Sequence, residues 1–222
     1  MIKKNKFFLL IFFFITLTTY NLDEQGENPS IFFPIKKIII ENTLAVDLNK
    51  LKAELEFLRN SSLFYLQKKK ITKILDKHDF ISNTQIKKKY PNTLKILVFE
   101  KVPVAIEVIG KNKNYLTKEG KKIDYIELNA YKNLPVIFGS HKNFSSLFYE
   151  LKKSNFKINT IKAFYYFDIG RWDVLLNDER VIKLPEVNYK RTLIEISLML
   201  DDPNFSKFKI FDYRIKNQLI LQ

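Results

Sequence analysis

The chain has 222 residues, of which 46% are hydrophobic and 14% aromatic, so it can bury a core and is not disordered throughout. It contains no cysteine, which excludes disulfides and thiol chemistry, and its two histidines are too few for a closed zinc site. The formal charge of +14 comes mostly from lysines spread along the chain, whereas nucleic-acid binders cluster basic residues and favour arginine. We therefore expect a folded protein that needs no metal or other cofactor and binds no nucleic acid.

The N-terminal stretch Phe7–Leu22 carries no charge, with lysines before it and carboxylates after it. A helix of this length rises about 24 Å, somewhat less than the roughly 30 Å of bilayer hydrocarbon. The pattern predicts a short cytoplasmic tail and a single transmembrane helix within residues 1–22, and everything after it on the far side of the membrane. A cleaved signal peptide is the alternative, although Thr16-x-Thr18 is a poor cleavage site; a buried core helix fits poorly because the stretch has no polar face.

Residues 23–34 are polar and contain Gly26, Pro29 and Pro34, which predicts a linker. Residues 35–102 then predict a small module of order β-α-α-β-β, with two helices covering one face of a three-stranded sheet. Asp47 is placed to cap the first helix. The expected strands are 38–40, 80–90 and 93–102, and the expected helices are 48–58 and 67–78.

Residues 103–222 predict a second domain, rich in strands and with two helices. Asn143 is placed to cap the first helix, and Pro185 and Asn188 open the second, which runs to Leu200. Two strand-like runs, 207–215 and 218–221, close the chain. The expected fold class is therefore α+β: an N-terminal transmembrane helix, a β-α-α-β-β module, and an antiparallel β-rich domain with two helices.

Sequence patterns typical of enzymes are weak. The chain has no phosphate-cradling glycine loop and no Gly-x-Ser-x-Gly elbow. Ser154-x-x-Lys157 and Ser206-x-x-Lys209 match the Ser-x-x-Lys of penicillin-binding enzymes, but the companion Ser-Asp-Asn and Lys-Thr-Gly motifs are missing. We therefore expect no enzymatic activity, and we expect Trp172 to be a core anchor rather than a ligand platform.

Five local motifs follow one another along almost the whole chain. They are Tyr90-Pro91-Asn92-Thr93-Leu94 with Val98-x-Glu100-x-x-Pro103-x-Ala105; Tyr115-Leu116-Thr117-x-x-Gly120; Leu134-Pro135-x-x-x-Gly139; Arg171-Trp172-Asp173 to Lys183-Leu184-Pro185; and Asp212-Tyr213-Arg214. In this order they resemble the FtsQ/DivIB family of bacterial cell-division proteins, in which the β-α-α-β-β module is called POTRA. The run Ile215-Lys216-Asn217-Gln218 departs from well-known members, which carry a tyrosine and a glycine there.

The resemblance implies a non-enzymatic scaffold with a single pass through the bacterial inner membrane. Its N-terminus would be cytoplasmic, its other domains periplasmic, and the protein would concentrate at the division site. The implied partners are FtsB- and FtsL-like proteins, bound at the end of the β domain, and the scaffold would help to recruit the septal peptidoglycan synthase.

Physical reasoning also favours the C-terminus as the binding region, because a strand such as 208–215 could present an unpaired edge to an extended partner segment. The predicted partner-binding residues are Ile210, Phe211, Asp212, Tyr213, Arg214, Ile215, Leu219, Ile220 and Leu221.

Other readings stay open at this point. Another POTRA protein, of outer-membrane assembly or secretion, would need repeated modules or a barrel, and neither pattern is present. A membrane-anchored envelope hydrolase would need a polar pocket with perturbed pKa values in the β domain.

Overall fold

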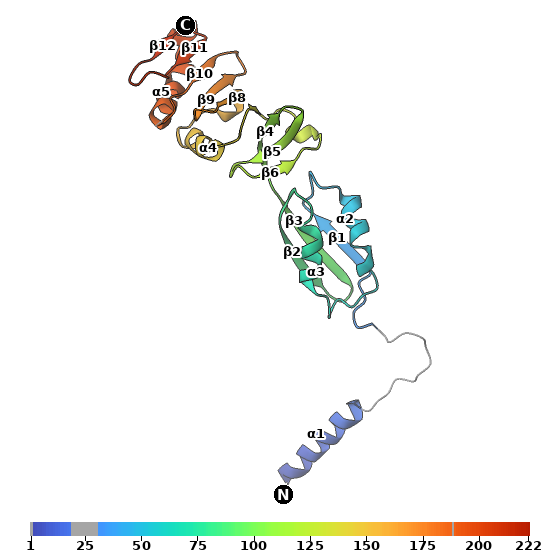
Figure 1. Ribbon diagram of the computed structural model, residues 1–222. Helices are drawn as coiled ribbons and strands as arrows, with labels where there is room; N and C mark the ends of the chain where they lie inside the picture. The colour runs from blue at the N-terminus through green and yellow to red at the C-terminus, as the bar shows by residue number, and fades with distance from the viewer. Residues whose placement is uncertain (1, 19–30, 188) are drawn as a thin grey trace.

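The computed structural model describes residues 2–18, 31–187 and 189–222 (Figure 1). Helix α1 (Ile2–Thr18) precedes two β-sheets. The first sheet has three strands in the order β1-β3-β2, and the second has nine, in the order β12-β11-β10-β9-β8-β7-β4-β5-β6. The α+β content expected from the sequence is therefore present.

The predicted transmembrane helix, Phe7–Leu22, is wrong. No helix within the described residues is long and apolar enough to cross a membrane. Three lysines fall inside α1, so its uncharged part, Phe7–Thr18, rises only about 18 Å. Residues 19–22, and residues 23–30 of the predicted linker, lie outside the described part of the chain.

The first sheet carries two helices on one face, as the apolar pattern predicted. Strand β1 is parallel to the central strand β3, and β2 is antiparallel to it. Alternate residues of β3, namely Leu94, Ile96 and Val98, are fully buried in one cluster with Leu51 and Leu75 of the helices. The bounds are β1 Lys37–Glu41, α2 Leu48–Glu54, α3 Lys68–Leu75, β2 Ile81–Lys89 and β3 Thr93–Glu100.

Asp47 caps α2 as predicted, because its side chain accepts hydrogen bonds from the backbone N–H groups of Asn49 and Lys50. Asn143 precedes α4 in the left-handed conformation, with φ at 59°, and its side chain makes no capping bond. The predicted cap at Asn143 is therefore wrong, and the first-turn amides of α4 are left without that partner.

The second sheet is mixed, so the prediction of an antiparallel domain is wrong. Strand pairs β4–β7, β7–β8 and β10–β11 are parallel. Helix α4 connects β7 to β8, and α5 connects β10 to β11; a helical crossover of this kind joins parallel neighbours. The bounds are β4 Pro103–Ile109, β5 Asn112–Thr117, β6 Lys122–Asp124, β7 Val136–Phe138, α4 Phe144–Lys153, β8 Ile161–Phe167, β9 Arg171–Leu176, β10 Val181–Lys183, α5 Tyr189–Asp201, β11 Ile210–Asp212 and β12 Ile220–Leu221.

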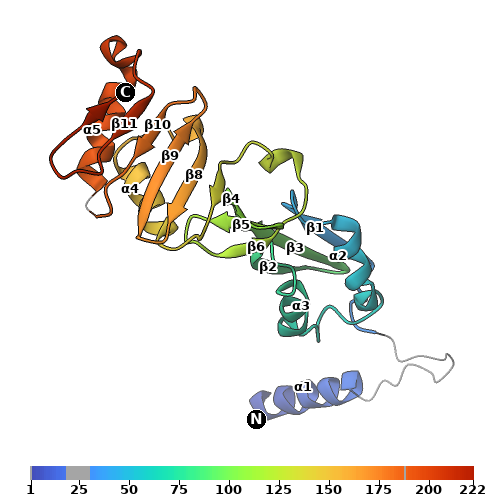
Figure 2. The same ribbon diagram turned by 45° about the horizontal axis from the view of Figure 1, so that its top comes forward.

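Both crossover helices pack on the same face of this sheet (Figure 2). Phe144 and Leu147 of α4 and Leu193 and Ile196 of α5 are fully buried. They share one cluster with inward-facing strand residues, among them Phe164, Trp172, Val174, Ile182 and Phe211. Burying an apolar side chain of this size contributes about 1.5–3 kcal/mol, so this layer fixes which face of each strand points inward.

The glycine of the Leu134-Pro135-x-x-x-Gly139 motif has a steric role. Gly139 follows β7 with φ at +93°, and a Cβ atom there would lie 2.8 Å from the Tyr166 carbonyl oxygen. Only glycine fits both the backbone conformation and this close approach.

The two sheets meet at an aromatic cluster. Phe80 of the first module packs against Tyr115 and Tyr131 of the second, with ring centroids 5.8 and 6.4 Å apart. Next to this cluster the carboxylate of Glu100, the last residue of β3, accepts hydrogen bonds of 3.0–3.1 Å from three successive backbone N–H groups, at residues 44–46. The carboxylate therefore holds the loop between β1 and α2 against the junction.

We predict that Glu100→Ala will lower the free energy of unfolding by about 1.5–3 kcal/mol, because the backbone amides of the exposed Leu44, the buried Ala45 and the half-buried Val46 lose a charged acceptor. The matched control is Glu41→Ala, which removes a carboxylate paired with Lys95 at 2.7 Å near the surface and should cost at most about 1 kcal/mol. Urea unfolding followed by circular dichroism measures both. If both variants lost the same free energy of unfolding, the hydrogen bonds of Glu100 would contribute no more to stability than a surface ion pair does.

Candidate partner-binding edge

The C-terminal strands form one border of the nine-stranded sheet (Figure 1). Strand β11 pairs with β10 on one side and with β12 on the other. The predicted unpaired edge at 208–215 is therefore wrong, because the β11–β12 connection folds the last residues back along β11. The free edge on this side of the sheet is β12, Ile220–Leu221.

The hydrogen-bond register shows which backbone groups of β12 face outward. Ile210 and Gln222 exchange both backbone N–H···O bonds, at 3.0 and 3.1 Å. Bonded pairs alternate along an antiparallel ladder, so Asp212 and Ile220 form the next bonded pair and Leu221 lies between them. The N–H and C=O groups of Leu221 therefore point away from β11, toward the open side of the sheet.

The nine predicted partner-binding residues separate into a buried group and an accessible group. Phe211, Asp212 and Tyr213 are buried, and Ile210, Leu219 and Leu221 are half-buried. Phe211, Leu219 and Leu221 belong to or pack against the core cluster. The accessible residues are Arg214, Ile215, which is 52% exposed, and Ile220, which is 39% exposed.

A groove of about 780 Å³ lies beside the edge, between α5 and the β11–β12 connection. Four of the predicted residues line it: Tyr213, Arg214, Ile215 and Leu219. The opposite wall comes from α5, with Arg191, Thr192, Glu195 and Met199, and from the segment 185–187. The α5 residues are not among the nine predicted from the sequence, although the i,i+4 spacing of Arg191 and Glu195, which form a 2.7 Å ion pair, indicates a charged helix face.

Tyr213 anchors the floor of this groove. Its hydroxyl contacts the Met199 sulfur at 3.5 Å. Burial, with a smaller contribution from the Glu195 charge, raises the pKa of Tyr213 to about 12. The hydroxyl is therefore protonated and uncharged at neutral pH, which suits a group packed between the sheet and α5.

Asp212 fixes the start of the β11–β12 connection. Its carboxylate accepts hydrogen bonds from the Arg214 backbone N–H at 3.0 Å, from Nε at 2.9 Å and from Nη2 at 2.6 Å. These bonds to Arg214 lower the pKa of Asp212, although its burial acts in the opposite direction. The Asp-x-Arg motif thus folds back on itself and orients the loop that borders the groove.

Asp173 lies in the same transverse row of the sheet, because Asp173, Lys183 and Asp212 are successive partners on β9, β10 and β11. Its burial raises its pKa even though Arg171, at 3.2 Å, and the neighbouring cations favour the charged form. In the folded protein the pKa of Asp173 is therefore raised and that of Asp212 is lowered, although the two residues lie in one row.

Within the described residues, no group of three or more His, Cys, Asp or Glu side chains could hold a metal ion. Each histidine instead faces one glutamate: His78 Nε2 lies 2.7 Å from Glu54, and His141 Nδ1 lies 2.6 Å from Glu107. Lys122 also contacts Glu107 at 2.9 Å, so this fully buried carboxylate has two cationic or polar partners.

Comparison with known proteins identifies the family. The model of the FtsQ-type POTRA domain matches residues 33–101. Cell division protein FtsQ of Rickettsia typhi is 28% identical to this chain, over 86% of this chain and 73% of its own length. These matches support the FtsQ/DivIB family for this chain. It is thus a cell-division protein with a POTRA domain.

Other relatives agree with this assignment. Cell division protein FtsQ of Rickettsia prowazekii is 28% identical over 86% of this chain and 72% of its own length, and that of Rhizobium meliloti is 23% identical over 73% and 54%. The solved extracytoplasmic domain of the cell division protein DivIB from Geobacillus stearothermophilus matches 47% of this chain and 98% of its own, at 14% identity and a TM-score of 0.31. We draw nothing from that structural match.

We predict that Asp212→Asn and Asp173→Asn will change stability in different directions. The pKa of Asp212 is lowered in the folded protein, so its charged form stabilises the fold at pH values above the ordinary aspartate pKa. This stabilisation is lost as the pH falls through the lower, folded-state pKa. At pH 7, Asp212→Asn should therefore lower the free energy of unfolding by about 1–3 kcal/mol. Asp173 has a raised pKa, so its charged form is disfavoured in the fold at pH 7, and Asp173→Asn should leave stability unchanged or increase it. Thermal unfolding at pH 7 measures both, and a larger loss for Asp173→Asn would contradict the assignment.

Proposed function

We propose that this cell-division protein is a non-catalytic scaffold that binds FtsB- and FtsL-like partners at the division site by strand addition to β12, and so helps to recruit the septal peptidoglycan synthase. The observation that supports this proposal is the unpaired outer side of β12, where the Leu221 backbone N–H and C=O groups point away from the sheet. A partner segment in extended conformation would continue the sheet by bonding to these groups.

The short length of β12 means that backbone bonds alone would give little affinity. Only Ile220 and Leu221 form the strand. Short edge strands also protect a protein from unspecific pairing, because few donors and acceptors are exposed. A specific partner must therefore gain further contacts from side chains near the edge.

Two such surfaces flank the edge, one on each face of the sheet. Ile220 is paired with Asp212 and lies on the face opposite to the helices. The groove beside α5 lies on the helix face and offers the exposed Ile215 as well as the charges of Arg191, Arg214 and Glu195. A strand added to β12 would point alternate residues toward these two surfaces. We therefore expect a partner segment with an apolar residue over Ile220 and polar residues of both charges toward the groove.

We predict that Leu221→Pro will abolish or strongly weaken co-purification with FtsB- and FtsL-like partners. Proline removes the outward N–H of residue 221 and leaves the inward bonds of residues 220 and 222 in place; edge strands tolerate proline in such a position. Co-expression and pull-down of the tagged full chain measures partner capture.

Leu221→Ala is the matched control, because it removes the same side-chain packing against the core but keeps the N–H donor. It should retain most of the binding, and circular dichroism should show native folding for both variants. Equal partner capture by Leu221→Pro and the unmodified chain would remove β12 from the interface, and equal loss in both variants would indicate side-chain packing rather than strand addition.

A further inference from the structure

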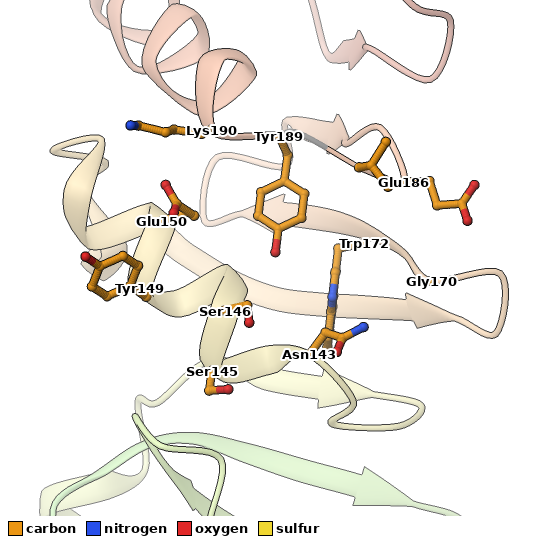
Figure 3. A pocket seen from close by; sticks show the side chains of 11 residues that line it. Asn143, Ser145, Ser146, Tyr149, Glu150, Gly170, Trp172, Glu186, Tyr189 and Lys190 are labelled. Atoms are coloured by element: carbon orange, nitrogen blue, oxygen red, sulfur yellow. The ribbon is translucent and has the colours of Figure 1, made fainter.

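A second cavity, of about 750 Å³, lies where the first turn of α4, the strand β9 and the start of α5 converge (Figure 3). The volume is in the range of sites for small ligands. Figure 3 shows Trp172 edge-on at this cavity, with the Tyr189 hydroxyl directed into the same space, Asn143 at the lower end of the Trp172 ring and Ser146 to its left. The residues proposed to contact a ligand are Ser145, Ser146, Glu150, Trp172 and Tyr189, and Glu186 lies at the exposed rim outside this set.

This cavity gathers buried polar atoms that have no hydrogen-bond partner. In the part of the chain that the structure describes, four buried side-chain atoms are unpartnered: Thr84 Oγ1, Glu107 Oε2, Glu150 Oε2 and Trp172 Nε1. Glu107 Oε2 nevertheless forms an ion pair with Lys122, which leaves three. Two of these three atoms, the acceptor Glu150 Oε2 and the donor Trp172 Nε1, belong to residues that line the same cavity. Because buried polar groups are normally satisfied, a complementary pair of this kind indicates a ligand that supplies both an acceptor and a donor.

We infer that this cavity binds a short peptide of about two residues with a free carboxylate and a free amino group. The carboxylate lies at the N-terminus of α4 and accepts a hydrogen bond from Trp172 Nε1–H, and the ammonium group lies against the Glu150 carboxylate.

The acceptor end of the ligand is specified by two independent features. Trp172 is only 1% exposed, and its indole nitrogen can only donate. The first turn of α4 adds the backbone N–H groups of Ser145 and Ser146, which donate no hydrogen bond to the Asn143 side chain. Helix N-termini favour negative charge through these free amides. A carboxylate satisfies both features at once.

The length of the ligand follows from helix geometry. Glu150 lies four residues beyond Ser146 on the same face of α4, so the two side chains are separated by about 6 Å along the helix axis. Two residues of extended peptide span about 7 Å. A dipeptide therefore places its carboxylate at the helix N-terminus and its ammonium group at Glu150, whereas a single amino acid is too short to reach both.

The remaining walls suit a polar ligand of this size. Burial and the nearby Glu150 charge raise the pKa of Tyr189, so its hydroxyl is protonated at neutral pH and can donate to a peptide carbonyl. Glu186 and Lys190 are exposed at the rim and have no hydrogen bond to the buried pair. The cavity does not involve β12, so the inference does not depend on the proposed partner edge.

The test uses Trp172 itself, which is the single tryptophan of the chain, as a fluorescent reporter in the full-length protein. Titration with the dipeptide Ala-Ala should give a saturable change in emission. The amidated peptide Ala-Ala-NH2, which lacks the carboxylate, and N-acetyl-Ala-Ala, which lacks the ammonium group, should each bind about tenfold or more weakly, since each loses a charge-assisted contact.

Variants separate the site from nonspecific effects. Glu150→Gln should weaken Ala-Ala binding about tenfold and should reduce the discrimination against N-acetyl-Ala-Ala, whereas Glu186→Gln, at the exposed rim, should change binding less than threefold. Isothermal calorimetry on the same variants measures binding independently of the indole. The inference would be overturned if the response did not saturate or if all three peptides bound with equal affinity. In either case the cavity would be a cleft that holds only solvent. Leu221→Pro should not change dipeptide binding. A negative dipeptide titration would therefore count against this cavity alone, and not against the proposed partner binding at β12.

Discussion

The structure of the second domain depends on one buried layer, in which α4 and α5 pack against the inner face of the nine-stranded sheet. Both helices are crossovers between parallel strands, so their apolar faces must cover the strands that they connect. This requirement places β11 next to β10, with Phe211 opposite Ile182 in the core. The chain can then continue only by turning back along β11, and β12 becomes the border of the sheet. The free edge is thus a consequence of helix packing.

The sequence predicted the existence and type of most elements because the local signals were strong. The alternation in β3 and the helical spacing around Leu51 and Leu75 fixed the first module, and Asp47 marked the start of α2. The parallel pairing in the second sheet was missed for a physical reason. A strand's pattern of apolar residues reports which face is buried but not the direction of its neighbour, and the helices between β7 and β8 and between β10 and β11 were the signal that indicated crossovers.

The sequence assigned the free edge at this end of the sheet to the wrong strand, because β12 and not β11 is the border strand. The run 207–215 is longer than 218–221 and holds more apolar residues in total, and length of this kind favours a central strand as much as an exposed one. Phe211 and Tyr213 satisfied the sequence criteria for partner contacts, yet they face the core and α5. The local sequence does not distinguish an aromatic residue that packs into the core from one that contacts a partner. The difference depends on which strand of the chain forms the border of the sheet.

The partner edge and the Trp172 cavity share one short boundary, since Glu186 and Val187 line both the groove beside β12 and the cavity beside α4. The two surfaces nevertheless use different physical means. In the proposed binding at β12 the partner would pair with backbone donors and acceptors, which any extended segment can do, so specificity would have to come from side chains around the edge. In the cavity the recognising groups are buried side-chain atoms, which discriminate by leaving a donor or acceptor unpaired when the wrong ligand enters. A broad surface for a protein partner and a narrow site for a small one can therefore exist side by side on the same buried layer.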